Sequence, residues 1–375
     1  MQEYHIMKNS KLTDNLVQRL LAPPLGGWGA SDLVQLLQSR GDDEKMLFDF
    51  SGKIKQENVG NTVYLRGLIE LSNICEKDCY YCGIRKSNSN VHRYSISDDE
   101  VMEAIKYARE NGYGSVAIQS GEIQSKAFTE KITRILQNTG KLTNGELGVT
   151  LSCGEQTEET YRQWFESGAH RYLLRIETSD RELYSKLHPN DHIHRFERRL
   201  EALEMLKKTG YQVGTGVMIG LPFQTVENLA DDLLFMKQFD IDMCGMGPYI
   251  EHHETPLYAF KDSLIPLKER LNLSLKMVAI LRILMPDINI AATTALQTIE
   301  KNGREQAIQV GANVLMPNIT PRKYRDDYFL YENKPVSGQS EADDLKNLEK
   351  SLEAIGHQIG YGVQGNSKHF GKKAP

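Results

Sequence analysis

The chain has 375 residues, of which 25% are charged and 40% hydrophobic. That composition excludes a disordered or fibrous protein and supplies enough apolar residues for one large core or two smaller ones. The 45 lysines and arginines stand against 50 aspartates and glutamates, and the net charge of -5 gives no basic surface for nucleic acid.

The first 60 residues predict a helical extension. Helical patterns are expected over residues 12–60, with Ser31 as the N-cap of the helix that carries Leu33. The amino terminus lacks the pattern of a signal peptide, and no apolar run is long enough to span a bilayer. We therefore expect a cytoplasmic protein without membrane contact.

From residue 61 the pattern alternates between strands and amphipathic helices. The expected strands are 62–71, 115–120, 147–152, 171–177, 212–219, 241–247, 288–293 and 312–317. Helices are expected between them, for example over 97–111, 194–209 and 225–238. Eight such units predict an α/β fold of the TIM type, a (β/α)8 barrel over residues 61–332. A doubly wound sheet is the structural alternative, because periodicity does not show whether a sheet closes.

The last segment, 333–375, is expected to form one C-terminal helix and a tail. The helix is predicted over 341–355. The tail is rich in glycine and lysine, and we expect it to be mobile.

Three cysteines follow directly on the first expected strand, in the run Cys-Glu-Lys-Asp-Cys-Tyr-Tyr-Cys that contains Cys75, Cys79 and Cys82. In a parallel barrel this is the catalytic rim. Three thiolates cannot complete a four-iron cubane, so one iron is left open for a small molecule. The alternative is a zinc site on Cys79 and Cys82 with His92 nearby, but no second cysteine pair exists in the chain.

Strand parity predicts a polar lumen. Successive side chains of a strand point alternately into the barrel and toward the helices. The inward set contains Arg66, Glu70, Gln119, Thr150, Ser152, Arg171, Arg175 and Glu177. A buried ion pair between arginine and glutamate could satisfy part of this set by itself, but so many polar groups on one axis favour a ligand cavity.

The cysteine loop, with an aromatic residue before its last cysteine, resembles the signature of radical S-adenosylmethionine (SAM) enzymes. Gly121-Glu122 resembles their amine-binding segment. A wider set of segments resembles [FeFe]-hydrogenase maturases of the HydE type and covers roughly residues 60–332. These segments are Arg66 to Tyr94, Gln119 to Glu122, Arg171 to Thr178, Gly220 to Pro222, Met246 to Tyr249, Ala292 to Ala295 and Gly311 to Asn318.

This resemblance implies a radical SAM enzyme with one 4Fe-4S cluster on Cys75, Cys79 and Cys82. SAM would bind the fourth iron through its amine and carboxylate, with Ser120 and Glu122 at the aminocarboxylate and Glu177 at the ribose. The implied cofactor contacts are Tyr81, Gln119, Ser120, Glu122, Arg175, Glu177, Arg199 and Met243. The implied substrate contacts are Arg66, Thr150, Ser152, Arg171, Thr293, Thr294, Met316, Tyr328 and Tyr331.

The resemblance also implies a reaction and partners. SAM would be cleaved reductively to a 5'-deoxyadenosyl radical, which acts on a small iron complex bearing CO, cyanide and cysteine. A partner maturase would supply this complex, and an electron donor would reduce the cluster. An organic substrate, as in methylornithine synthase or biotin synthase, is the alternative within the superfamily, and a zinc-stabilised protein without catalysis is the alternative outside it.

The sequence departs from the family pattern in three places. Residues 333–375 contain no cysteine, although some relatives carry C-terminal cysteines for a second cluster. The stretch 190–195 resembles an insertion and leaves Arg198 as an alternative to Arg199. Phe223 stands where a glycine is common in the corresponding turn.

Overall fold

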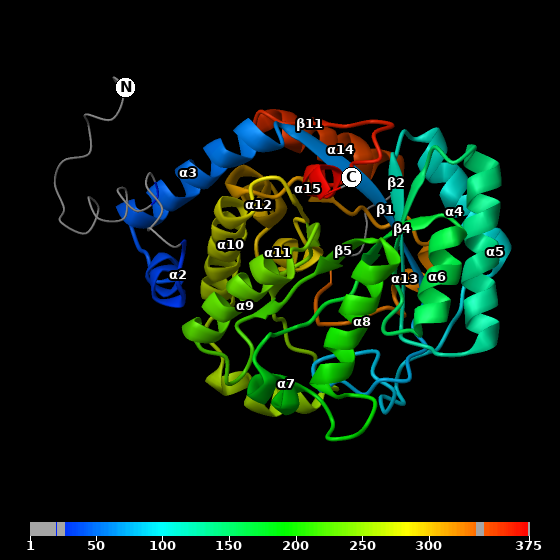
Figure 1. Ribbon diagram of the computed structural model, residues 1–375, viewed down its shortest axis with the longest axis horizontal. Helices are drawn as coiled ribbons and strands as arrows, with labels where there is room; N and C mark the ends of the chain where they lie inside the picture. The colour runs from blue at the N-terminus through cyan, green and yellow to red at the C-terminus, as the bar shows by residue number, and fades with distance from the viewer. Residues whose placement is uncertain (1–19, 21–26, 335–340, 374–375) are drawn as a thin grey trace.

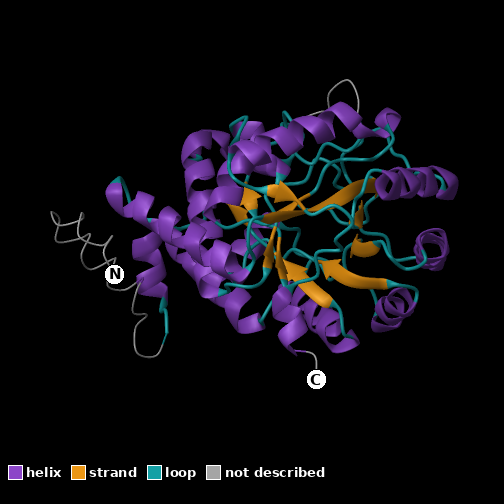
Figure 2. Cartoon of the chain, turned by 90° about the horizontal axis from the view of Figure 1, so that it is seen from above, coloured by secondary structure: helices purple, strands orange, loops and turns teal. Residues whose placement is uncertain are grey.

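The fold of the chain is a barrel of parallel strands with an outer ring of helices (Figures 1 and 2). The computed structural model describes residues 20, 27–334 and 341–373. Eight strands pair in the order β10-β1-β2-β3-β4-β5-β7-β9, and a bridge between Ala291 and Val314 joins the last strand to the first. The Ala292 N–H donates to the Val314 carbonyl at 2.9 Å across this seam. The predicted barrel is confirmed, and the open doubly wound sheet is excluded.

The strands lie close to the predicted positions. Their bounds are β1 Thr62–Ser72, β2 Ser115–Ser120, β3 Gly148–Ser152, β4 Ala169–Leu173, β5 Gln212–Thr215, β7 Met243–Cys244, β9 Asn289–Ile290 and β10 Val314–Leu315. The fourth strand begins two residues earlier than expected and ends before Arg175.

Two predicted strands are each divided into two. The chain continues beyond β5 and β7 into a separate short pair, β6 (Met218–Ile219) and β8 (Gly247–Pro248). A Cβ atom at Gly216 would lie 2.1 Å from the Gly245 carbonyl oxygen. The two backbones therefore approach at a distance that only glycine permits, and regular pairing is interrupted there.

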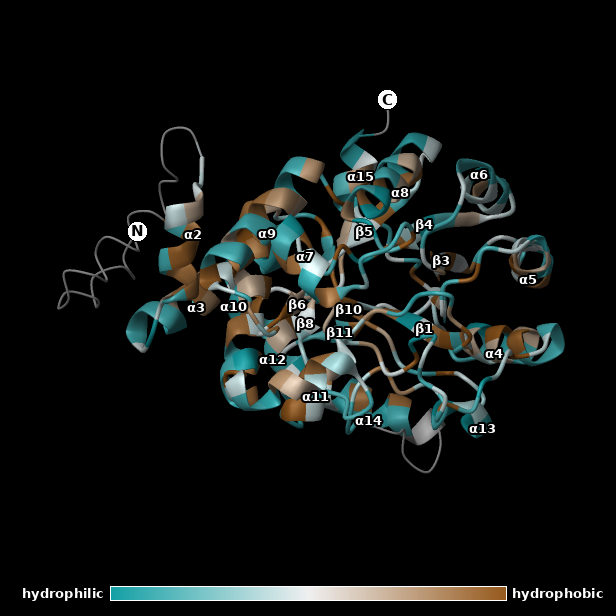
Figure 3. Cartoon of the chain, turned by 90° about the horizontal axis from the view of Figure 1, so that it is seen from below, coloured by the Kyte–Doolittle hydropathy of each residue, from teal (hydrophilic) through white to brown (hydrophobic). Residues whose placement is uncertain are grey.

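The helices cover the outside of the barrel, and hydrophilic and hydrophobic residues are interspersed along them (Figure 3). They are α4 Asp98–Glu110, α5 Lys126–Thr143, α6 Glu158–Glu166, α7 Arg181–Leu187, α8 Phe196–Thr209, α9 Val226–Phe239, α10 Leu267–Leu284, α11 Thr294–Ile299, α12 Gly303–Val310 and α13 Arg322–Arg325, with a 3-10 helix over Pro256–Ser263. In α4, Ser97 and Glu100 form a reciprocal capping box, and Val101 and Ile105 are buried against the sheet side. This local pattern explains why the helix was predictable from the sequence.

The N-terminal extension contains α2 (Ala30–Leu37) and α3 (Asp42–Asn58), which lie beside α9 and α10. Helix α2 begins after Gly29, so the prediction of Ser31 as N-cap is wrong. The buried ammonium of Lys276 donates to the Leu37 and Ser39 carbonyls at 3.2 and 2.5 Å and so satisfies the end of α2. The expected helical pattern before residue 27 lies outside the described residues, apart from residue 20.

The C-terminal segment packs across the amino-terminal end of the barrel. After α14 (Glu341–Ala354), β11 (Gln358–Ile359) pairs with the first residues of β1, and α15 (Lys368–Lys373) follows. We call residues 358–373 the plug. The Gly365 carbonyl accepts from Arg66 Nη2 at 3.2 Å and from Asn289 Nδ2 at 2.9 Å. The expectation of a mobile tail is wrong, because these contacts fix the tail beneath the strands.

Among the helices of the described part of the chain, we find none with the length and apolar character needed to cross a membrane.

Candidate functional site

A cavity of about 360 Å³ occupies the barrel lumen and the space between the loops at the carboxyl ends of the strands. That volume falls in the range of sites for small molecules. Its wall contains every site residue predicted from the sequence except Arg171. The inward side chains predicted from strand parity therefore line this cavity, apart from Arg171. We call this cavity the chamber.

The cluster loop, residues 73–83, connects β1 to the rest of the rim and carries the three cysteines. The Glu122 N–H points at Cys75 Sγ at 3.3 Å, and the Glu76 N–H donates to the Glu122 carbonyl at 2.7 Å. A Cβ atom at Gly121 would lie 2.2 Å from the Ile74 carbonyl oxygen. Glycine is thus required at position 121 for the cluster loop and the β2–α5 loop to meet.

The three thiols line the chamber, with Cys79 buried and with Cys75 and Cys82 partly buried. Burial raises the pKa of all three, that of Cys79 to about 12, and the neighbouring sulfurs raise the pKa values of Cys79 and Cys82 further. An iron–sulfur cluster supplies the positive charge that such a trio of thiolates needs.

The zinc alternative needs His92 close to Cys79 and Cys82, which both line the chamber. His92 lies outside the chamber wall and pairs with Asp327 at 2.9 Å.

Arg93 organises the cluster loop and was missed from the sequence. Its guanidinium donates to four backbone carbonyls, at distances between 2.6 and 3.0 Å; these belong to Asn73, Ile84, Arg85 and Asn88. One side chain thereby fixes the loop on both sides of the cysteines. A single arginine after a cysteine motif gives no sequence signal for this role.

Glu177 stands on a strained backbone at the carboxyl end of the fourth strand. Its φ of 66° lies in the left-handed region, which non-glycine residues rarely adopt. Its carboxylate is buried, and Oε2 lies 3.2 Å from Arg175 Nη2. Burial raises the pKa of Glu177, although Arg175 and Arg199 oppose that shift. Strain and a buried carboxylate together are typical of a binding residue.

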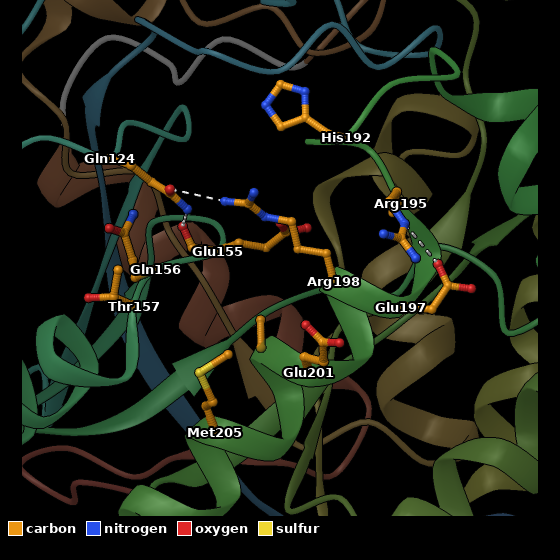
Figure 4. Close-up of a pocket in the computed structure, with 11 residues that line it drawn as sticks. Gln124, Glu155, Gln156, Thr157, His192, Arg195, Glu197, Arg198, Glu201 and Met205 are labelled. Carbon is orange, nitrogen blue, oxygen red and sulfur yellow. Dashed lines mark hydrogen bonds and ion pairs between the residues drawn. The ribbon is translucent and has the colours of Figure 1, made fainter.

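Arg199 and Arg198 lie on opposite sides of Glu155. Arg199 lines the chamber, and its Nη1 donates to the Arg175 carbonyl at 2.5 Å. Arg198 lines a separate surface cavity instead (Figure 4). Of the two candidates left open by the sequence, Arg199 is the one that the structure brings to the site.

The deeper wall of the chamber joins side chains from several strands. Arg66 Nη1 donates to Met243 Sδ at 3.1 Å, and Gln119 Nε2 donates to the Tyr328 hydroxyl at 3.1 Å. Thr293, Thr294, Thr150, Ser152, Met316 and Tyr331 complete the predicted set.

Lys334 also lines the chamber and was missed, because it follows the last strand by many residues. It forms an ion pair with the buried Glu70, and its ammonium lies 5.1 Å from the centre of the Tyr328 ring.

Arg171 does not lie at the chamber. Its guanidinium is buried at the amino-terminal end of the barrel, where Nη1 donates to the Gln364 carbonyl at 2.9 Å and to Asn366 Oδ1 at 2.8 Å. The parity argument placed it inside the barrel correctly, but the plug occupies that end. We therefore leave Arg171 out of the proposed substrate contacts.

The chamber wall contains buried polar atoms without a hydrogen-bond partner. Among the described residues these include Arg66 Nε and Arg175 Nε, and Glu177 Oε2 has its ion pair with Arg175 but no hydrogen bond. Such atoms are rare unless a ligand satisfies them. Cationic and anionic groups beside three thiols fit a cluster together with a ligand that carries an amine, a carboxylate and hydroxyls.

Comparison with known proteins agrees with this site. The model of the radical SAM superfamily matches residues 69–236, which hold the three cysteines. Fold, thiol trio and chamber define a radical SAM enzyme, which uses a 4Fe-4S cluster and SAM. The chain is 42% identical over 334 residues to the [FeFe] hydrogenase maturase subunit HydE of Thermotoga maritima. This alignment covers 89% of this chain and 92% of that protein. It belongs to the HydE family.

Other relatives are more distant. The 3-methylornithine synthase of Methanosarcina acetivorans is 28% identical over 87% of the chain and 88% of its own length. The crystal structure of methylornithine synthase (PylB) superposes with a TM-score of 0.77 at 24% identity and covers 94% of this chain and 98% of its own. The maturase HydG from Carboxydothermus hydrogenoformans superposes with a TM-score of 0.76 at 18% identity, over 93% of this chain and 79% of that one. These two structures support the fold alone.

Proposed function

We propose that this enzyme acts in assembly of the diiron subcluster of [FeFe]-hydrogenase. The 42% identity to HydE across 89% of the chain carries this proposal. The proposed substrate is a small iron complex bearing CO, cyanide and cysteine, supplied by a partner maturase in the cytoplasm. A chamber of about 360 Å³ with arginine, hydroxyl and thioether groups suits a small anionic complex of this kind.

We assign the cofactors to the rim of the chamber. Cys75, Cys79 and Cys82 hold the cluster through their sulfurs. When bound, the cluster passes one electron from a donor protein to SAM, which yields methionine and a 5'-deoxyadenosyl radical. The residues that hold SAM are Tyr81, Gln119, Ser120, Glu122, Arg175, Glu177, Arg199 and Met243, with Glu122 at the amine and Glu177 at the ribose.

We assign the substrate to the deeper part of the chamber. Its contacts are Arg66, Thr150, Ser152, Thr293, Thr294, Met316, Tyr328 and Tyr331, and we add Lys334 because its ammonium faces the same space. The plug covers the barrel beneath Arg66, whose Nη2 donates to the Gly365 carbonyl at 3.2 Å. Exclusion of water from such a chamber would protect a carbon radical from side reactions with solvent.

Co-expression tests the proposed function. An [FeFe]-hydrogenase is produced with its partner maturases, either with this chain or without it, in a host that has no maturase of its own. We expect hydrogen evolution only when the chain is present, and none with the Cys79→Ala variant. Equal hydrogen evolution without the chain would contradict the proposal.

The same strains separate the organic-substrate alternatives. If methylornithine or biotin synthesis, rather than hydrogenase activity, depends on the chain, the assignment to hydrogenase maturation is wrong while the radical SAM chemistry stands.

A further inference from the structure

A network of buried charges lies between the cluster loop and α8. Glu155 follows β3, is 1% exposed, and contacts three cations: Arg199 Nε at 2.7 Å, Lys77 Nζ at 2.9 Å and Arg198 Nε at 3.0 Å. Glu122 lies beside it and accepts from the Glu155 backbone N–H at 2.9 Å. Neither Lys77 nor Glu155 was singled out by the sequence.

The two carboxylates share the same cations unequally. Lys77 is 2.9 Å from Glu155 but 3.3 Å from Glu122, and Arg199 bonds to Glu155. An ionised carboxylate can accept about four hydrogen bonds. Glu155 uses this capacity on three charged donors, whereas Glu122 keeps room for a further donor.

We propose that Glu155 is a positioning residue for SAM. By holding Lys77 and Arg199, it leaves the Glu122 carboxylate free to accept from the ammonium of SAM. Without Glu155, two resident cations would face a single carboxylate and compete with the ammonium for it. This inference rests on the proposed placement of the SAM amine at Glu122, and it does not depend on the identity of the substrate.

The outer cation has a different position. Arg198 approaches Glu155 from a surface cavity of about 330 Å³ and also donates to Gln124 Oε1 at 3.0 Å (Figure 4). Its side chain is 33% exposed, against 8% for Arg199. Glu155 itself lines the surface cavity, whereas its partners Lys77 and Arg199 line the chamber. Loss of Arg198 leaves the inner contacts in place, so it should affect SAM little.

The test measures the SAM dissociation constant of the anaerobically reconstituted full chain, without substrate. We expect Glu155→Gln to weaken SAM binding by about tenfold, with Glu155→Asp retaining most of the affinity. The iron content and the electron paramagnetic resonance (EPR) spectrum without SAM should stay unchanged. With saturating SAM the turnover number should stay within about twofold, because the defect lies in binding.

Two further variants test the competition itself. Adding Lys77→Gln to Glu155→Gln removes one competing cation, and we expect it to recover about threefold of the lost affinity. Glu197→Gln is the matched control. Glu197 lines the same surface cavity but pairs with Arg181 and Arg195 rather than with the network (Figure 4). Its affinity for SAM should equal that of the unmodified chain.

Unchanged SAM affinity in Glu155→Gln would overturn the inference, as would a double variant that binds no better than the single one. If Glu155→Gln does not fold, the double variant decides, since it keeps the buried charges balanced and should bind SAM about threefold more weakly than the unmodified chain. Full affinity in the double variant would then overturn the inference. A Glu122→Ala variant distinguishes the two levels of the argument. If it binds SAM normally, the placement of the amine at Glu122 is wrong and the role given to Glu155 is wrong with it.

Discussion

Replacing Glu177 by glutamine should weaken SAM binding without weakening the fold. The Glu177 N–H donates to the Gly216 carbonyl at 3.0 Å, and its carbonyl accepts from the Met218 N–H at 3.1 Å. The backbone is therefore anchored on both sides independently of the side chain. Glutamine has the same shape, so the substitution removes only the charge and one strong acceptor.

The size of the effect follows from the proposed contacts. A hydrogen bond to a charged group contributes about 1.5–3 kcal/mol, and glutamine retains one acceptor oxygen, so the loss should be about 1.5–2 kcal/mol, or roughly 10- to 30-fold in affinity. Equilibrium dialysis with the reconstituted protein measures this change. Glu130→Gln, a substitution on the exposed face of α5, is the control.

Stability should respond differently from affinity. Burial raises the pKa of Glu177, so the folded protein holds a proton more tightly than the unfolded chain. As the pH rises from the pKa of Glu177 in the unfolded chain to its higher pKa in the folded protein, the contribution of Glu177 to the free energy of unfolding therefore decreases. Glutamine does not titrate, so the variant lacks this decrease. At neutral pH the variant should be at least as stable in urea denaturation. Normal SAM affinity in a fully loaded variant would refute the ribose role of Glu177.

Three further predictions concern the cluster, the plug and a buried lysine. Cys79→Ala should remove iron and sulfide together. Cys153→Ala, at a buried position outside the chamber, should keep both. Cluster absorption retained in Cys79→Ala would contradict the ligand assignment. Asn366→Ala should lower the free energy of unfolding by about 1–3 kcal/mol, because Asn366 Oδ1 accepts from Arg171 at 2.8 Å and from Gln212 at 3.0 Å. Asn366→Asp should lower it less, because the aspartate adds a negative charge beside a buried arginine. Equal losses of stability in the two variants would argue against this geometry. Burial, and then Arg282, lower the pKa of Lys55 to about 7, so the unfolded chain binds more protons than the folded protein above that pH. The free energy of unfolding should therefore rise between about pH 7 and 10.5, by at most about 1.4 kcal/mol per pH unit. Lys55→Met should flatten that rise, and parallel curves of stability against pH for the two proteins would disprove the prediction.

The sequence predicted the barrel and most of the chamber for a physical reason. Long strands such as β1 carry the alternation of inward and outward side chains, and the barrel makes every inward position converge on one axis. Local signals also sufficed for α4, whose capping box lies within four residues.

Other features depend on contacts between distant parts of the chain, and the sequence did not reveal them. The division of two strands follows from the approach of Gly216 to Gly245, which requires both strands in place. Arg171 was assigned to the substrate because nothing in its neighbourhood indicates that Gln364 and Asn366 bond to it. Lys77 looked like an ordinary loop charge, since its partner Glu155 lies 78 residues away.

The plug has a consequence for labelling the enzyme. Its anchoring residues, His369, Lys372 and Lys373, bind Asp240, Asp242 and Asp287, which precede β7 and β9. The three cysteines follow the opposite end of β1. A fluorescent label attached to the plug would therefore report on the barrel from the end remote from the cysteines.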